Sequence, residues 1–222
     1  MTDAHCHIEG DNPSIREFVI GRDFVGVHPW ESAKLSHEEI KAKIENLRLL
    51  LTSHPERGVG EIGLDRLKER EISPQMRELF EDQLKLAFEL HRSVVLHGAK
   101  CWGQVVKTIQ ALIKNPNQIP FLFHGFSRSD GLIPDIVALN GYISVGPAVL
   151  NDHAVNYQKL VQKIPLDRLL LETDRMQENA DQCPSLVEVA TAVAHLRGLS
   201  ISQLETRTDQ NAKTFICYTT QK

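Results

Sequence analysis

The first residues of the chain carry side-chain types that bind divalent metal ions. Asp3, His5 and His7 alternate along the segment Met1–Ile8. Alternate side chains of a β-strand point to the same face, so these three would share one face. Two imidazoles one strand repeat apart can hold one ion such as zinc. Taken alone, the segment fits equally a buried strand whose histidines bond to the backbone or to each other.

Further candidate ligands follow or interrupt apolar stretches along the chain: Glu61, His97, His124 and Asp174. A hydrogen-bonded core group is the alternative for any single one of them. Together with His5 and His7 they come from five strands, and a divalent metal would satisfy two carboxylates and four histidines at once. Six ligands exceed the four that a tetrahedral ion takes, so we expect two ions that share a bridging carboxylate.

Strands and helices alternate from residue 36 onward. We expect strands at 58–65, 93–98, 121–125, 142–146 and 169–174, and helices at 36–54, 73–90, 103–114, 132–139, 153–164, 185–197 and 202–216. Ser36 with Glu39, and Ser202 with Glu205, have the spacing of a capping box at a helix start. Continuous apolar strands separated by amphipathic helices are typical of parallel strands buried on both faces.

The places of the polar residues distinguish a barrel from an open sheet. The candidate ligands, with His28 and Asp65, fall at or near the C-terminal ends of strands, which form the active face of a TIM-type barrel. No glycine-rich fingerprint follows the first strand, which argues against dinucleotide binding in a doubly wound sheet. We therefore predict an α/β fold, a TIM-type (β/α) barrel formed as one domain by residues 1–222.

The N-terminal part strains this prediction. Residues 17–21 and 24–28 are expected to form two short strands or one bent strand. Ten residues separate Ile8 from Val19, and only Arg22 and Asp23 separate these two strands. A parallel crossover needs about a dozen residues. We therefore expect a barrel that is distorted or shortened in its first αβ unit.

Composition limits the partners. The formal net charge of −4 argues against a broad basic surface for duplex DNA, although metals could still hold a phosphate substrate. The four cysteines lie far apart without a C-x-x-C pair, which fits reduced thiols in a cytoplasmic protein. We find no apolar run long enough to span a bilayer and no signal peptide, so we expect a cytoplasmic monomer that does not bind membranes.

The motifs, taken in order, resemble those of the TatD family of metal-dependent deoxyribonucleases, which belong to the amidohydrolase-type hydrolases. The resemblance covers nearly the whole chain and rests on Asp3-Ala-His5-Cys-His7, Gly26-Val-His28-Pro29-Trp30, Gly60-Glu61-Ile-Gly-Leu-Asp65, Gln75…Phe80…Gln83-Leu84, Val95-Leu-His97, Phe123-His124-Gly-Phe126-Ser127, Leu171-Glu172-Thr173-Asp174 and Asn211-Ala212…Phe215.

This resemblance implies a distorted TIM barrel with a site for two divalent ions, Zn, Mg or Mn. His5, His7 and Asp174 would hold one ion, His97 and His124 the other, and Glu61 would bridge them. Asp174 would also take a proton from, or orient, the attacking water. Metal ions at such a site ionise water near neutral pH and bracket a scissile phosphate.

Three departures from the family pattern concern substrate binding. His97 is followed by Gly98-Ala99-Lys100 instead of a small residue, an arginine and an acid; Ser127-Arg128-Ser129 replaces a Gly-Ser type ending; and Arg175-Met176 replaces an early proline. We therefore predict that Arg128 or Arg175, and more weakly Lys100, supplies a phosphate contact, because a guanidinium pairs bidentately with phosphate.

Two further residues are predicted near the substrate, each with an alternative. His28 either lines the pocket above the metals or caps the turn at Pro29. Asp65 either orients a ligand histidine, and so lies near the substrate, or caps the following loop.

These features leave three functions open. The first is hydrolysis of phosphodiesters in DNA, at single-stranded ends rather than in duplexes. The second is hydrolysis of a small ester, amide or lactone on the same barrel. The third, a metal-loaded binding protein without turnover, is disfavoured because all six ligands are retained.

Overall fold

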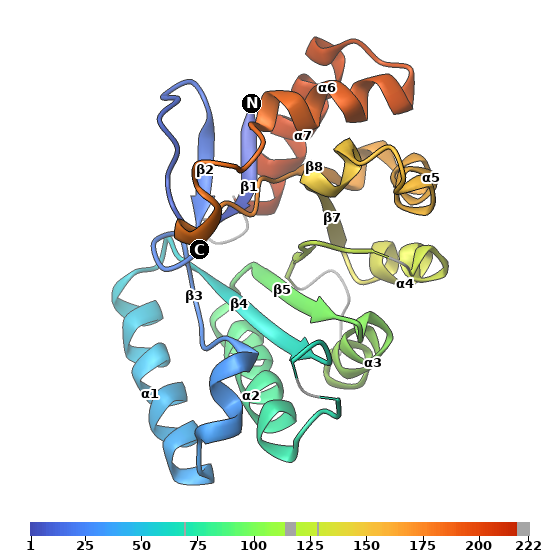
Figure 1. Cartoon of the computed structure of the whole chain (residues 1–222). Coiled ribbons are helices and arrows are strands. Elements are labelled where there is room, and N and C mark those ends of the chain that lie inside the picture. Colours follow the sequence, from blue (N-terminus) through green and yellow to red (C-terminus); the bar gives the residue numbers. More distant parts are fainter. Residues whose placement is uncertain (69, 114–118, 128, 217–222) are drawn as a thin grey trace.

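The computed structural model describes residues 1–68, 70–113, 119–127 and 129–216. Its strands run parallel and stand in chain order around a barrel (Figure 1). Their bounds are β1 Thr2–Cys6, β2 Arg16–Val19, β3 Phe24–Val25, β4 Gly58–Asp65, β5 Val94–Ala99, β6 Phe121–Phe123, β7 Gly141–Val145 and β8 Leu169–Leu171. The predicted TIM-type barrel is confirmed.

Two ladders, β1–β2 and β3 to β8, make up the barrel, and isolated bonds join them. Ile20 bridges to Phe24 between β2 and β3. On the other side, beyond the end of β8, Asp174 N donates to His5 O at 3.0 Å and His7 N donates to Arg175 O at 2.8 Å. The barrel therefore closes through residues next to the predicted metal ligands.

The helices are α1 His37–Ser53, α2 Pro74–Leu90, α3 Trp102–Leu112, α4 Ile133–Ala138, α5 Val155–Lys163, α6 Leu186–Arg197 and α7 Ile201–Ile216. Lys114, the predicted end of the third helix, lies outside the described residues. The capping box predicted at Ser202 and Glu205 is wrong by two residues: Ser200 and Gln203 exchange the capping bonds at 2.9 and 3.1 Å. Within the described residues no helix has the length and apolarity to cross a membrane.

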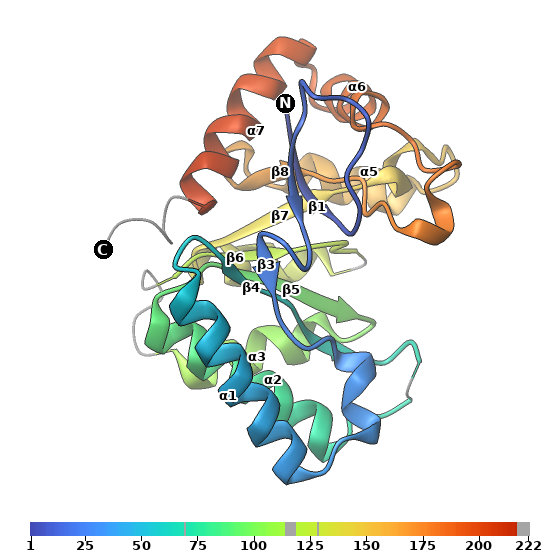
Figure 2. The same cartoon turned by 90° about the vertical axis from the view of Figure 1, so that its left-hand side faces the viewer.

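The first αβ unit is shortened, as predicted. Residues 7–15 join β1 to β2 and residues 20–23 join β2 to β3, both without a helix (Figure 2). From β3 onward, by contrast, each strand is followed by a helix that covers the outside of the barrel. The side of the barrel next to β1 and β2 is instead covered by α7, which packs on β1 and β8.

The barrel interior is filled by apolar side chains from seven strands and from α7. Phe215, near the end of α7, stacks on Phe24 with ring centres 5.7 Å apart and also contacts Phe18 and Tyr142. The members of this cluster are Ala4, Phe18, Phe24, Val95, Leu122, Tyr142, Leu170, Ala212 and Phe215. They form a packed floor, and polar residues follow along the same strands.

Strand β4 carries a bulge that re-aims one of the predicted ligands. Its register against β5 shifts between Val59 and Ile62, so β4 has one extra residue around Glu61. Bulges of this kind often lie beside active sites, because they turn a side chain out of the regular alternation. Gly63 follows at φ +154, where a Cβ atom would overlap His97 O. Glycine is therefore required for the close approach of β4 to β5.

We expect Gly63→Ala to destabilise the protein by about 2–4 kcal/mol, because it combines steric overlap with an unfavourable backbone conformation. Gly103→Ala is the matched control, since a Cβ atom meets nothing within 4 Å at this position in α3. It should leave stability unchanged or raise it by up to about 1 kcal/mol. Urea unfolding of both variants measures the difference, and equal stabilities would show that the approach at Gly63 can relax freely.

Candidate metal centre

Three polar residues of the site lie two positions beyond residues of the barrel floor. His97 follows Val95 in β5, and His124 follows Leu122 at the end of β6. Because alternate strand residues share a face, these imidazoles point into the barrel above the apolar floor. Glu172 follows Leu170 in the same way. The pattern places the site at the C-terminal ends of the strands.

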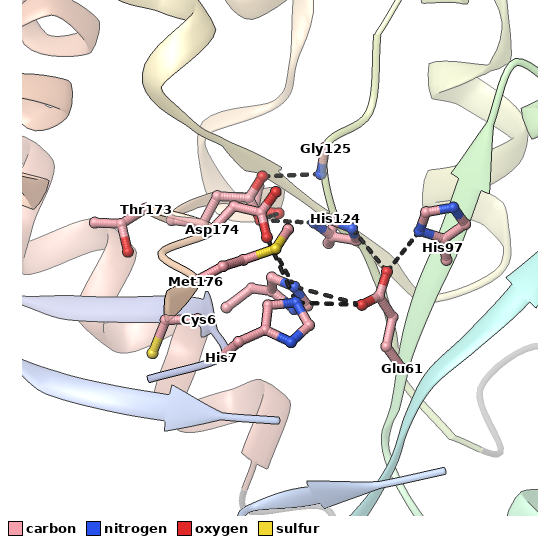
Figure 3. Close-up of polar contacts among 12 residues, drawn as sticks. Cys6, His7, Glu61, His97, His124, Gly125, Thr173, Asp174 and Met176 are labelled. Carbon is pink, nitrogen blue, oxygen red and sulfur yellow. Dashed lines mark hydrogen bonds and ion pairs between the residues drawn. The ribbon is translucent and has the colours of Figure 1, made fainter. Parts of the chain in front are cut away.

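Glu61 is the centre of the cluster, and each of its oxygens faces a different group of histidines (Figure 3). Oε2 lies 3.7 Å from His5 Nε2 and 3.6 Å from His7 Nε2. Oε1 lies 2.6 Å from His97 Nδ1 and 2.9 Å from His124 Nε2. The side chain is 3% exposed. A carboxylate with one histidine pair on each oxygen has the arrangement of a bridging ligand.

Asp174 completes the first of these groups. Its Oδ1 lies 3.4 Å from His5 Nε2 and 3.6 Å from His7 Nε2. The residue adopts φ +50, a left-handed conformation that aspartate tolerates better than most residues. This turn follows β8 directly and leaves the Asp174 N–H bonded to His5 O. The side chain is 36% exposed, so Asp174 lies on the side of the site that faces solvent.

The spacing in the first group fits ligands of a common ion better than hydrogen bonds. Two ligand atoms about 2.1 Å from one tetrahedral ion are about 3.4 Å apart. The contacts of His5 and His7 span 3.4–3.7 Å, beyond the usual hydrogen-bond range. Both ring nitrogens of His5 and Oδ1 of Asp174 are buried without a hydrogen-bond partner among the described residues. Such atoms are costly unless a further group binds them, and a divalent ion fits.

Two buried carboxylates lie behind the histidines of the second group. Asp65 Oδ2 accepts from His97 Nε2 at 2.9 Å, on the side of the ring opposite Glu61. Glu172 Oε2 lies 3.5 Å from His124 Nδ1, a charge contact longer than a hydrogen bond, and His124 Nδ1 has no hydrogen-bond partner among the described residues. Glu172 is itself fixed by Gly125 N at 2.8 Å and Ser144 Oγ at 2.5 Å. A carboxylate behind a ligand histidine sets its orientation and raises its basicity.

Glu172 was missed as a site residue from the sequence, although it was part of a quoted motif. The available signal was its position two residues after the interior residue Leu170, the same step that separates Leu122 from His124. Asp3 is a second supporting residue outside the ligand set. Its Oδ2 accepts from Thr173 Oγ1 at 2.6 Å and its Oδ1 from Thr173 N at 3.1 Å. It therefore anchors the segment that leads to Asp174.

Strand alternation alone does not place Asp3 correctly relative to His5 and His7. The β1–β2 register shifts between Asp3 and Cys6, so β1 also contains a bulge. His5 and His7 reach the cluster while Asp3 stays with Thr173. Burial raises the pKa of Asp3 to about 6, against the hydrogen bonds from Thr173.

The charges in the cluster compensate one another. Burial alone would raise the pKa of Glu61, but His124, His28 and His97 outweigh burial and hold it well below its usual value. Burial alone would lower the pKa of His124, but Glu61 and Glu172 keep it well above the usual value. Glu61 is therefore charged, and cations, whether protons or metal ions, must balance it.

His28 makes both contacts that the sequence allowed. Its Nδ1 accepts from Trp30 N at 3.2 Å and so caps the 3-10 helix η1, Pro29–Lys34. Its Nε2 lies 3.7 Å from Glu61 Oε1. Because a neutral imidazole whose Nδ1 accepts carries its proton on Nε2, His28 presents an N–H to the cluster. The ring is thus suited to contact an anionic ligand rather than a metal ion.

Asp65 likewise fulfils both sequence expectations. It supports His97, and its Oδ1 accepts from Leu67 N at 2.5 Å and Lys68 N at 3.0 Å in the following loop. The residue is 1% exposed. These contacts favour orientation of His97 over direct contact with a substrate, and the substrate contact stays a prediction.

The three cations predicted to bind phosphate lie in different surroundings. Arg175 pairs with Glu17 Oε1 at 2.6 Å and packs beside Gly10, so it joins the β1–β2 connection to the segment after β8. Arg128 lies outside the described residues. Lys100 lines a cleft of about 760 Å³ that also contains His97, His124 and Asp174. A substrate can reach the cluster through this cleft.

Comparison with known proteins agrees with this geometry. The family model described as TatD related DNase matches residues 22–216. The chain is 27% identical to an uncharacterized metal-dependent hydrolase, YabD of Bacillus subtilis, over 91% of this chain and 83% of that protein. It is 28% identical to the 3'-5' ssDNA/RNA exonuclease TatD of Pantoea vagans, over 85% of this chain and 75% of that protein.

The fold is shared with a solved structure. YJJV, a TatD homologue from Escherichia coli K12, superposes with a TM-score of 0.81 at 23% identity, covering 96% of both chains. This likeness extends over the shortened N-terminal part as well as the helical part of the barrel. Since the family match spans most of the chain and the barrel gathers carboxylates and histidines at one end, this protein belongs to the TatD-related DNase family and is a metal-dependent hydrolase.

Proposed function

We propose that this hydrolase cleaves phosphodiester bonds at the ends of single-stranded nucleic acids, with two divalent ions bound at the cluster. The observation that carries the proposal is Glu61, whose two oxygens face two separate histidine pairs. Two-ion sites are common in nucleases and phosphatases, where they stabilise both oxygens of an in-line displacement. The exonuclease relative from Pantoea vagans supports single-stranded DNA or RNA as the substrate class.

The residues divide between two sites. His5, His7 and Asp174 would hold one ion, while His97 and His124 would hold the other, with Glu61 shared by both. Bound ions would lower the pKa of a water molecule and offset the negative charge of the phosphate. Zn, Mn and Mg differ in their preference for imidazole nitrogens over carboxylate oxygens. The imidazoles of this site favour Zn over Mg.

The chain's own groups would then direct the reaction. Asp174 borders both the cluster and the cleft, where it would orient the attacking water and accept its proton. His28 would donate its Nε2 proton in a hydrogen bond to a phosphate oxygen. Asp65 and Glu172 would keep His97 and His124 in place, so that little reorganisation accompanies the reaction.

The substrate class is tested with a 5'-labelled single-stranded oligonucleotide and its hairpin duplex, incubated with Mg²⁺, Mn²⁺ or Zn²⁺. We expect stepwise shortening of the single strand, slower cleavage of the duplex, and no product after chelation with EDTA. Parallel assays use p-nitrophenyl acetate and a simple lactone. Turnover of the ester or lactone without cleavage of the oligonucleotide would establish the small-molecule alternative instead.

Asp174→Asn should lower kcat on the oligonucleotide by at least about a hundredfold, because an amide cannot accept a proton at this position. The variant should still bind metal through the histidines and Glu61, as isothermal titration with Mn²⁺ can show. Asp152→Asn, at an exposed turn, is the control for loss of a charge. Undiminished hydrolysis by Asp174→Asn would remove this residue from the catalytic step.

Glu172→Gln should weaken metal binding about tenfold to a hundredfold, because the buried group behind His124 loses its negative charge. The amide can still accept from Gly125 N, so the fold should be retained and circular dichroism should be unchanged. Glu178→Gln, at an exposed position, serves as the control for loss of one negative charge. When hydrolytic activity is measured at increasing metal concentration, Glu172→Gln should regain activity at high metal concentration. A variant with normal metal affinity would contradict a supporting role for Glu172.

A further inference from the structure

Trp30 lies exposed beside the metal centre. The chain has two tryptophans, and Trp30 is 44% exposed whereas Trp102 is buried in the core. The centre of the Trp30 ring lies 4.6 Å from that of His28 and 6.3 Å from that of His97. A partly exposed indole ring therefore stands beside two histidines of the cluster.

Hydrogen bonds fix this ring relative to the cluster. Trp30 Nε1 donates to Asp65 Oδ2 at 2.7 Å, and the same oxygen accepts from His97 Nε2 at 2.9 Å. Trp30 N donates to His28 Nδ1. The ring N–H fixes the indole against Asp65 and the backbone N–H fixes the residue against His28, so the orientation of the ring is preset before any substrate binds. A preset aromatic surface loses little conformational entropy when a ligand stacks on it.

A cation accompanies the ring. Lys68, in the loop after β4, places its Nζ 3.2 Å from the centre of the Trp30 ring. Among the described residues Lys68 forms no ion pair with a carboxylate within 4.0 Å, so its charge is available to an anionic ligand. An exposed aromatic ring with an adjacent lysine is the combination by which proteins bind single-stranded nucleic acids, the ring stacking on a base and the ammonium pairing with the backbone.

We propose that Trp30 and Lys68 form a subsite for the nucleotide next to the scissile phosphodiester. The base stacks on the indole, and the ammonium moves from the ring to the neighbouring phosphate. This proposal rests on the proposed nuclease function, and it names Trp30 and Lys68 as residues that select the substrate. The exchange is favourable because a cation–π contact at an exposed site is weaker than base–aromatic stacking together with a new charge pair.

The Trp30 fluorescence tests binding without turnover. A hydrolysis-resistant phosphorothioate oligonucleotide should quench tryptophan emission in a saturable way, while a strand of equal length and charge with abasic residues at its end should not. Trp30→Phe should remove most of the quenching, because the remaining Trp102 lines the cleft but is only 5% exposed. Equal quenching by both strands, or none by either, would overturn the subsite. This measurement needs no catalysis, so it remains decisive if the proposed nuclease activity fails.

KM and kcat of Trp30 variants distinguish base stacking on the indole from an indirect effect, in which Trp30 positions His97 through Asp65. Trp30→Ala should raise KM for the oligonucleotide about tenfold to a hundredfold with kcat changed less than threefold, and the effect should vanish on the strand with an abasic end. Trp30→Phe keeps an aromatic face but loses the donor to Asp65, and it should recover most of the lost affinity. If both variants lose kcat equally, Trp30 acts by positioning His97 and the subsite is wrong.

Lys68→Ala should raise KM several-fold on both strands, because the phosphate charge is common to them, and the effect should shrink at high salt. Lys107→Ala, exposed on α3, is the matched control for loss of one positive charge. A Lys68→Ala variant that behaves like this control would restrict the subsite to the base and overturn the proposed phosphate contact.

Discussion

A buried carboxylate whose two oxygens face opposite groups of histidines determines the arrangement of this protein. Glu61 is removed from water in the middle of the barrel mouth, where an unbalanced charge would be costly. His5 and His7 surround one of its oxygens, and His97 and His124 surround the other. The bulge in β4 turns Glu61 toward these rings. The strands carrying the histidines must therefore stand around β4 in a closed barrel.

The barrel supplies this arrangement by simple alternation in two of its strands. His97 and His124 lie one strand repeat beyond interior apolar residues, so the strands themselves position them. Asp174 is different, because its strand has ended and its side chain reaches the cluster through a left-handed turn. Rigid strands thus hold the histidines, while the residue proposed to handle the proton sits where the chain meets solvent.

The sequence predicted the barrel, its shortened first unit and the residues that converge at its mouth. These follow from strand periodicity and loop length, which are local properties. It left open whether Asp65 orients a histidine or caps the following loop, and it revealed neither Glu172 beside His124 nor the pair of Arg175 with Glu17. These contacts depend on which strand ends meet. Likewise, no local pattern revealed the bulge that separates Asp3 from the ligand set.

The shortened N-terminal part has a consequence for how the site forms. Without helices beside β1 and β2, polar contacts hold this side: His5 O and His7 N bond to the backbone of Asp174 and Arg175, and Arg175 pairs with Glu17. The bonds that close the barrel are therefore the bonds that bring the first ligand group together. Each bond contributes little stability alone. Because the bonds share residues, loss of one would weaken both the closure between β1 and β8 and the placement of the first ligand group. On this side of the barrel, the same bonds close the fold and place the first ligand group.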